Sequence, residues 1–122
     1  MSEYLQAERA QEWRKTLRKS MKSKDRTAIP RVKMPEVDPE IRSHTYDEVN
    51  LGLTEAMARE ESHRCLDCVD PTCITGCPVE INIPKFIKNI ERGDYLEAAR
   101  TLKETSALPA VCGRVCPQER QC

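Results

Sequence analysis

The stretch that decides the fold is Cys65-Leu-Asp-Cys68-Val-Asp-Pro-Thr-Cys73-Ile-Thr-Gly-Cys77-Pro78. Its spacing is Cys-x2-Cys-x4-Cys-x3-Cys-Pro. A second run, Cys112-Gly-Arg-Val-Cys116-Pro117-Gln-Glu-Arg-Gln-Cys122, has the spacing Cys-x3-Cys-Pro-x4-Cys. Closely spaced thiolates on an irregular loop can converge on one iron–sulfur cubane, and N–H groups of that loop can bond its sulfides. Together the two runs indicate iron–sulfur binding.

Zinc is the main alternative, in the form of a zinc-stapled interaction module. Structural zinc sites use two pairs of ligands, and only Cys65 and Cys68 have the spacing of such a pair. Both histidines, His44 and His63, lie outside the cysteine runs, and a single zinc would leave three of the seven cysteines idle. Disulfides are disfavoured because the cysteine count is odd.

The composition explains why a metal staple is needed. The chain has 122 residues, of which 39% are apolar, 33% charged and 4% aromatic. So few aromatic and apolar side chains cannot build a large core, and small domains of this kind rely on covalent or metal crosslinks. The start, MSEYLQAERA, is polar and lacks the apolar region of a secretory signal, and no apolar run approaches a bilayer span. We therefore expect a cytoplasmic protein without a membrane partner.

The net charge of zero hides a division along the chain. Residues 1–33 hold ten basic and four acidic residues, residues 34–64 hold three and eight, and residues 65–122 hold seven and eight. A basic start can indicate nucleic-acid binding. Here the positive residues alternate with Glu, and almost no aromatic residues are present for stacking on bases. The pattern favours a basic arm that docks on an acidic part of the same chain or of a partner.

Three segments follow from the pattern. Residues 1–26 form a basic N-terminal helix or arm, with a helical stripe of Leu5, Trp13, Leu17 and Met21 that predicts a helix from about Ser2 to Lys24. Residues 27–53 contain Pro30, Pro35 and Pro39 and form an extended strap. Residues 54–122 form a helical cysteine-rich domain.

The third segment carries helix signals, and no stretch of it alternates polar and apolar residues with the period of two that is typical of a strand. Together these observations predict an all-α fold. Phe86, Ile87 and Ile90 form the expected apolar face of a helix that runs to Arg92 and is followed by one ending near Ser106. The expected end signals are caps at Asp47, Thr54 and Asp94, a first-turn proline at Pro84 and a terminating glycine at Gly93.

A family resemblance extends beyond the cysteines. The matching stretches are Gly76-Cys77-Pro78-Val79, Ile81-Asn82-Ile83-Pro84, Gly93-Asp94-Tyr95, Glu97-Ala98-Ala99 and Leu108-Pro109-Ala110-Val111-Cys112-Gly113-Arg114-Val115-Cys116-Pro117-Gln118-Glu119. Residues 40–122 resemble the N-terminal iron–sulfur domain of the NADPH-dependent glutamate synthase small (β) subunit. Trp13-Arg14 and Met34-Pro35-Glu36-Val37-Asp38-Pro39 are also similar to small-subunit sequences. Dihydropyrimidine dehydrogenase and the large subunit of the NADH-dependent ferredoxin:NADP oxidoreductase resemble the same domain.

The resemblance implies an all-helical domain whose cysteine-rich loops wrap two [4Fe–4S] clusters. By position, Cys65, Cys68 and Cys73 would hold one cluster, and Cys77, Cys116 and Cys122 the other. Cys112 matches a position that is not always a ligand. In the family the chain continues past Cys122 with another cysteine and a non-cysteine ligand, followed by domains for FAD and NADPH. The resemblance therefore implies a domain truncated at its C-terminus, with no catalytic residue of its own.

Ligand counting leads to the same expectation without the family. Two cubanes need eight ligands, and seven cysteines cannot supply them. No Gly-x-Gly-x-x-Gly motif for a dinucleotide is present. The implied role is to relay electrons from the FAD of the same parent chain to a flavin in the glutamate synthase large subunit or an equivalent partner. The sister oxidoreductases and a free-standing ferredoxin-like carrier are alternatives.

Charged residues near the cysteines leave two readings open. Lys85, Lys88 and Arg92 recur along one helix. They could dock a partner or place positive charge beside a reduced cluster, or they could form an ordinary solvated face. Asp67 and Asp70, which lie between the cysteines, are expected to be loop formers.

Overall fold

A computed structural model describes residues 3–122 and has an all-helical architecture, as the sequence predicts. Over these residues no β-strand forms, and one isolated bridge joins Glu36 to Asn50. None of the described helices has the length and apolar character needed to cross a membrane. The helices are α1 (Glu3–Arg9), α2 (Glu12–Ser20), α3 (Ser23–Ala28), α4 (Pro39–Arg42), α5 (Glu55–Ser62), α6 (Thr72–Gly76), α7 (Ile83–Glu91), α8 (Tyr95–Lys103), α9 (Pro109–Val115) and α10 (Gln118–Gln121).

Helix α7 is the centre of the packing and contacts α8, α5 and α2. The Asn82 side chain caps its start by accepting a hydrogen bond from the backbone N–H of Lys85, at 3.2 Å. Gly93 ends the helix with φ of 83°, a left-handed conformation that suits glycine. Asp94 then caps α8. The predicted signals at Pro84, Gly93 and Asp94 are therefore confirmed.

The interior is unusually polar. Among the described residues, the buried hydrophobic side chains are Ile74, Ile81 and Ala98, whereas the largest side chains that are fully buried are Arg26, Lys88, Asn89, Thr101 and Asp67. The predicted apolar face of α7, with Phe86, Ile87 and Ile90, is only half-buried. Hydrogen-bonded ion pairs therefore occupy positions that apolar side chains fill in most domains.

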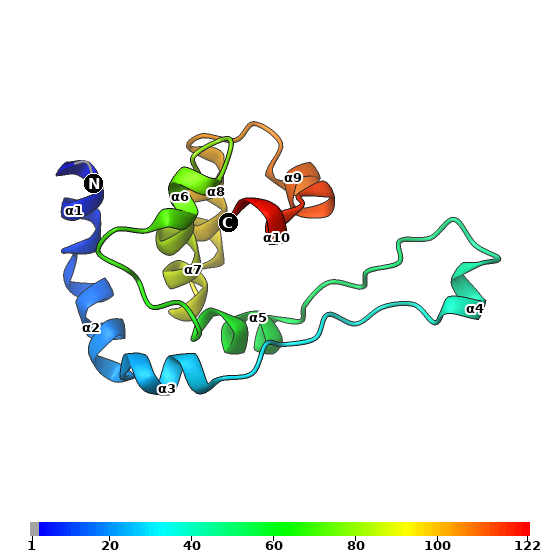
Figure 1. Ribbon diagram of the computed structural model, residues 1–122, viewed down its shortest axis with the longest axis horizontal. Helices are drawn as coiled ribbons and strands as arrows, with labels where there is room; N and C mark the ends of the chain where they lie inside the picture. Colours follow the sequence, from blue (N-terminus) through cyan, green and yellow to red (C-terminus); the bar gives the residue numbers. More distant parts are fainter. Residues whose placement is uncertain (1–2) are drawn as a thin grey trace.

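The N-terminal segment is helical but is not the single predicted helix. It is divided into α1, α2 and α3, which run along one side of the molecule (Figure 1). Ser2, the predicted start, lies outside the described residues. A continuous helix of this length would be straight over about 35 Å. The breaks at Ala10 and Met21 bend the segment, so that Arg14 and Arg26 both reach the loop before α6.

The strap leaves the helical body as a long arm with α4 at its far end (Figure 1). Its two limbs are joined by backbone hydrogen bonds from Val37 to Val49 (2.8 Å) and from Leu51 to Pro35 (2.9 Å). Thr54 caps α5 as predicted, accepting a hydrogen bond from Met57. The cap predicted at Asp47 is wrong, because the chain there stays irregular and no helix follows until α5.

Candidate metal centre

The seven cysteines are free thiols in two regions of the fold. Cys65 and Cys68 lie in the loop between α5 and α6, Cys73 lies on α6, and Cys77 follows that helix. In the second run, Cys112 lies on α9, Cys116 follows it, and Cys122 follows α10. The sequence analysis placed the cysteines in loops and did not predict α6 or α9. In the structure, Cys73 and Cys112 lie on these two short helices.

A close backbone approach brings the two runs together at Gly76. A Cβ atom on Gly76 would overlap the carbonyl oxygen of Gln121, and it would lie 3.2 Å from the carbonyl carbon and 3.4 Å from Cα of Cys122. Only glycine leaves room for this contact, so the last residues of the second run pack directly on α6. Cys122 is thereby placed beside the first run.

The electrostatics of the thiols follow this arrangement. Burial first, and then the neighbouring thiols of Cys65, Cys68 and Cys122, together raise the pKa of Cys73 to about 11. The pKa of Cys116 is also raised, first by desolvation and then by Cys122, Cys77 and Cys112. Cys122 therefore lies within electrostatic reach of both runs. Thiols that raise one another's pKa are close enough to repel as thiolates, and a bound metal group would relieve that repulsion.

Two cysteines of the second run, Cys112 and Cys116, have hydrogen-bond partners nearby in the sequence. The thiol of Cys112 and the hydroxyl of buried Ser106 are 3.7 Å apart, and the thiol of Cys116 donates to the side-chain carbonyl of Gln121 at 3.6 Å. Cys112 thus has an alternative role as a packed thiol. Its place on α9 still leaves it among the neighbours that act on Cys116.

The loop from residue 63 to residue 68 is held by the N-terminal segment. Asp67 has φ of 52°, and its buried carboxylate accepts hydrogen bonds from Arg14 and from Arg18, the latter at 2.5 Å. Arg9 donates to the backbone carbonyl of Asp67 at 2.8 Å. Asp67 is therefore more than a loop former. The basic arm docks on an acidic residue of the same chain, which the charge pattern suggested without identifying the residue.

A second ion-pair network holds the same loop from the other side. Lys88, which has no exposed surface, donates to the backbone carbonyl of Cys65 at 2.8 Å and to the carboxylate of Glu91 at 2.5 Å. Arg26 donates to Glu91 at 2.8 Å and to the carbonyl of His63 at 2.8 Å. Burial acts to raise the pKa of Glu91, but the hydrogen bonds from Arg26 and Lys88 outweigh it, so this pKa lies below its ordinary value.

The solvated-face reading of α7 is therefore wrong for two of its three cations. Lys88 is fully buried, and Lys85 is buried and paired with Glu104 at 2.9 Å. Arg92 is exposed and stacks over the Trp13 ring, 4.0 Å from its centroid. The spacing of these cations along the helix could not reveal that the loop carrying Cys65 covers Lys88, or that Glu8 and Glu104 enclose Lys85.

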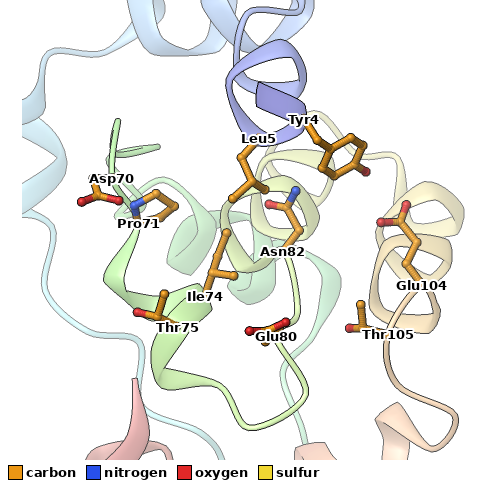
Figure 2. A pocket seen from close by; sticks show the side chains of 10 residues that line it. All are labelled: Tyr4, Leu5, Asp70, Pro71, Ile74, Thr75, Glu80, Asn82, Glu104 and Thr105. Carbon is orange, nitrogen blue, oxygen red and sulfur yellow. The ribbon is translucent and has the colours of Figure 1, made fainter. Parts of the chain in front are cut away.

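A hollow of about 420 Å³ lies beside the first run but is separate from the thiols. Figure 2 shows its lining side chains, which come from α1, the α6 region and the end of α8, with Leu5 and Ile74 between Asp70 and Glu104. The amide nitrogen of Asn82 is buried there without a hydrogen-bond partner. None of the residues that line the hollow is a cysteine; they are Tyr4, Leu5, Asp70, Pro71, Ile74, Thr75, Glu80, Asn82, Glu104 and Thr105.

The donor set fits an iron–sulfur group. Within residues 3–122, no three His, Cys, Asp or Glu side chains converge as they would around a single metal ion. A cubane is much larger than one ion, so its ligands surround it instead of meeting at a point. Soft thiolates from a loop, a short helix and a second segment are the ligands such a group takes.

Comparison with known proteins gives consistent matches. Residues 42–122 match the family described as dihydropyrimidine dehydrogenase domain II, 4Fe-4S cluster. The chain is 39% identical over 94 residues to the glutamate synthase [NADPH] small chain of Escherichia coli, which covers 77% of this chain and 20% of that protein.

Two further relatives extend the comparison. Over 89 residues the chain is 40% identical to the glutamate synthase [NADPH] small chain of Halomonas elongata, covering 72% of this chain and 19% of the relative. Over 76 residues it is 43% identical to the NAD-dependent dihydropyrimidine dehydrogenase subunit PreT of Salmonella typhimurium, covering 62% and 18%. The chain thus spans about a fifth of the length of these relatives.

Proposed function

The chain belongs to the dihydropyrimidine dehydrogenase domain II family of 4Fe–4S proteins, and we propose that it relays electrons between two flavins of a larger oxidoreductase. It is an iron–sulfur electron-transfer domain of the kind found in relatives named glutamate synthase small chain and dihydropyrimidine dehydrogenase subunit. The observation that carries the proposal is the contact of Gln121 with Gly76, because it joins two cysteine runs into one thiol-rich region.

The ligand assignment is part of the proposal. Cys65, Cys68 and Cys73 hold one [4Fe–4S] cluster, and this grouping is supported because Cys65 and Cys68 raise the pKa of Cys73 more than Cys122 does. Cys77, Cys116 and Cys122 hold the other, and this grouping is supported because Cys122 and Cys77 raise the pKa of Cys116 more than Cys112 does. Cys112 pairs with Ser106 and serves in packing. Two clusters need eight ligands, so the remaining ligands come from groups other than these six thiols.

The residues of this chain bind the clusters, orient the cysteine loops and shield both from water, and none of them is catalytic. When bound, a [4Fe–4S] cluster accepts and returns single electrons, which lets a two-electron hydride donor serve a distant acceptor. The thiolates hold the clusters at a fixed separation, and the ion pairs on Asp67 and Cys65 hold the first loop in shape. FAD and NADPH sites of the parent protein supply the electrons, and a flavin of a large subunit accepts them for reductive glutamate synthesis.

A second candidate places the same domain in a dihydropyrimidine dehydrogenase. The identity of 43% to the PreT subunit is as high as that to the glutamate synthase small chains, although it covers less of this chain. The two parents differ in their final substrate. Mixing the reduced protein with 2-oxoglutarate and glutamine, or with uracil, in the presence of each large subunit would tell them apart by which mixture reoxidises it.

The cluster content tests the relay itself. We expect anaerobically reconstituted protein to be brown, to contain iron and acid-labile sulfide in equal amounts, and to bleach with dithionite. Cys68→Ser and Cys116→Ser should each lose about half of the iron, whereas Cys112→Ser should keep nearly all of it. Colourless protein with one zinc per chain would refute the proposal in favour of a zinc-stapled module. Full iron retention in both Cys68→Ser and Cys116→Ser would refute the assignment of these cysteines as ligands.

A further inference from the structure

Cationic side chains crowd the loop that carries the first two cysteines. Five of them contact residues between His63 and Asp67, namely Arg9, Arg14, Arg18, Arg26 and Lys88. Two carboxylates, those of Asp67 and Glu91, are bound to this group. Five positive charges against two negative ones leave three in excess. Arg64, within the loop, is paired with Glu61 and does not change this balance.

Part of the excess charge is shielded from water: three buried cations face two buried carboxylates, whereas Arg9 and Arg18 are partly exposed. The side chains of Arg14 and Arg26 are 3% and 2% exposed, and that of Lys88 is 0% exposed. Solvent and salt screen such groups much less than they screen surface charges. Lys88 also donates directly to the carbonyl of Cys65, so its charge lies against the backbone of a cysteine in the first run.

The second cysteine run has no comparable surroundings. Its charged residues, Arg114, Glu119 and Arg120, are all exposed. Arg114 is paired with Glu48 of the strap, and both side chains are more than 60% exposed. These four charges cancel in sum, and solvent screens them. The two candidate sites therefore differ in the buried charge beside them.

We propose that Arg9, Arg18 and Lys88 are positioning residues that hold the first cysteine loop and raise the reduction potential of the site formed by Cys65, Cys68 and Cys73. The inference rests on the proposed function. Taking up one electron makes the site more negative by one charge, and fixed positive charge nearby stabilises that state. Burial works in the opposite direction by disfavouring added charge, and the cationic side chains offset that effect at the first site.

Arg18 offers the cleanest test. Its side chain is 20% exposed, and Arg14 remains on Asp67 when it is removed, so Arg18→Gln should still fold. Arg18→Lys keeps the charge. Arg100→Gln is the matched control, because it removes an exposed arginine that pairs only with Glu97 among the described ion pairs. Arg9→Gln is a second variant, which removes a charge that rests on a backbone carbonyl instead of a carboxylate.

The measurement is a potentiometric titration of the full natural protein followed by electron paramagnetic resonance, with Cys68→Ser identifying the signal of the first site. We expect Arg18→Gln and Arg9→Gln to lower the midpoint of that signal alone, Arg18→Lys to restore it, and Arg100→Gln to leave both signals in place. Unchanged midpoints in variants that keep wild-type iron would overturn this inference and leave the relay intact. Wild-type protein that binds no cluster would overturn both.

Discussion

The guanidinium of Arg14 and the carboxylate of Asp67, which are 53 positions apart in sequence, form a salt bridge in which both side chains are buried. This pair ties the N-terminal segment to the residue between the first two cysteines. Replacing Asp67 by Asn keeps the shape and the tolerance for positive φ but removes the charge. We expect Asp67→Asn to lower the free energy of unfolding by about 3–5 kcal/mol, because Arg14 is left buried without its counterion.

Urea unfolding followed by circular dichroism measures this effect. Asp70→Asn is the control, since Asp70 is exposed in the same loop, and its change should stay within about 0.5 kcal/mol. Equal stabilities for the two variants would mean that the Arg14–Asp67 pair contributes nothing to the fold.

Two glycines in the cysteine runs should respond in opposite ways to alanine. A methyl group at Gly76 would collide with Gln121, so Gly76→Ala should cost about 1–3 kcal/mol and lower the iron bound per chain by displacing Cys122. Gly113 lies in α9 with nothing within 4 Å of an added Cβ, so Gly113→Ala should be neutral or gain up to about 1 kcal/mol. Iron assays and urea unfolding measure both. Iron binding by Gly76→Ala at the wild-type level would contradict the proposed role of this contact.

The carboxylate of Glu91 should make the free energy of unfolding depend on pH below neutrality. Because its pKa in the folded chain lies below the ordinary 4.5, its stabilising effect is complete above pH 4.5 and is lost as the pH falls through the lower folded value. Glu91→Gln should therefore destabilise the cluster-free chain at pH 7, and the difference from wild type should shrink toward pH 3. Urea midpoints across this range measure it, with exposed Glu60→Gln as control. A difference that does not vary with pH would exclude the ionised carboxylate as its source.

Cys73 should react slowly with alkylating reagents in the cluster-free chain. With a pKa of about 11, only about one thiol in a thousand is ionised at pH 8, and the thiolate is the reactive form. Iodoacetamide labelling read by peptide mass spectrometry should find Cys73 modified well after the exposed Cys68, and faster as the pH rises. In urea the two rates should converge. Early labelling of Cys73 under folding conditions would show that its surroundings are more open than the structure indicates.

Local signals predicted the helices near the centre of the fold. Proline, glycine and capping residues act on their own neighbours, so Pro84, Gly93 and Asp94 could be read without knowing the tertiary structure. Asp47 failed as a cap because a capping side chain needs a helix-forming stretch after it, and the chain there follows the strap instead. The resemblance likewise identified the family from residues that are adjacent in the sequence.

Long-range contacts could not be predicted in this way. Lys88 has the spacing of a surface residue, and only the loop folded over it makes it buried. The contact of Gly76 with Gln121 also depends on how distant segments meet. The basic arm was expected to dock on acidic groups, but nothing in its sequence singles out Asp67 from the other acidic residues of the chain.

The ionic interior has a consequence for how this sequence can change over generations. In a hydrophobic core, one aliphatic side chain can replace another of similar volume with little loss of stability. Here, losing Glu91 would leave both Arg26 and Lys88 buried without their carboxylate, and losing Arg26 would leave Glu91 with one of its two buried cations. A tolerated change must therefore replace the paired residues together. Related sequences should either keep Arg26, Lys88 and Glu91 or substitute all three at once.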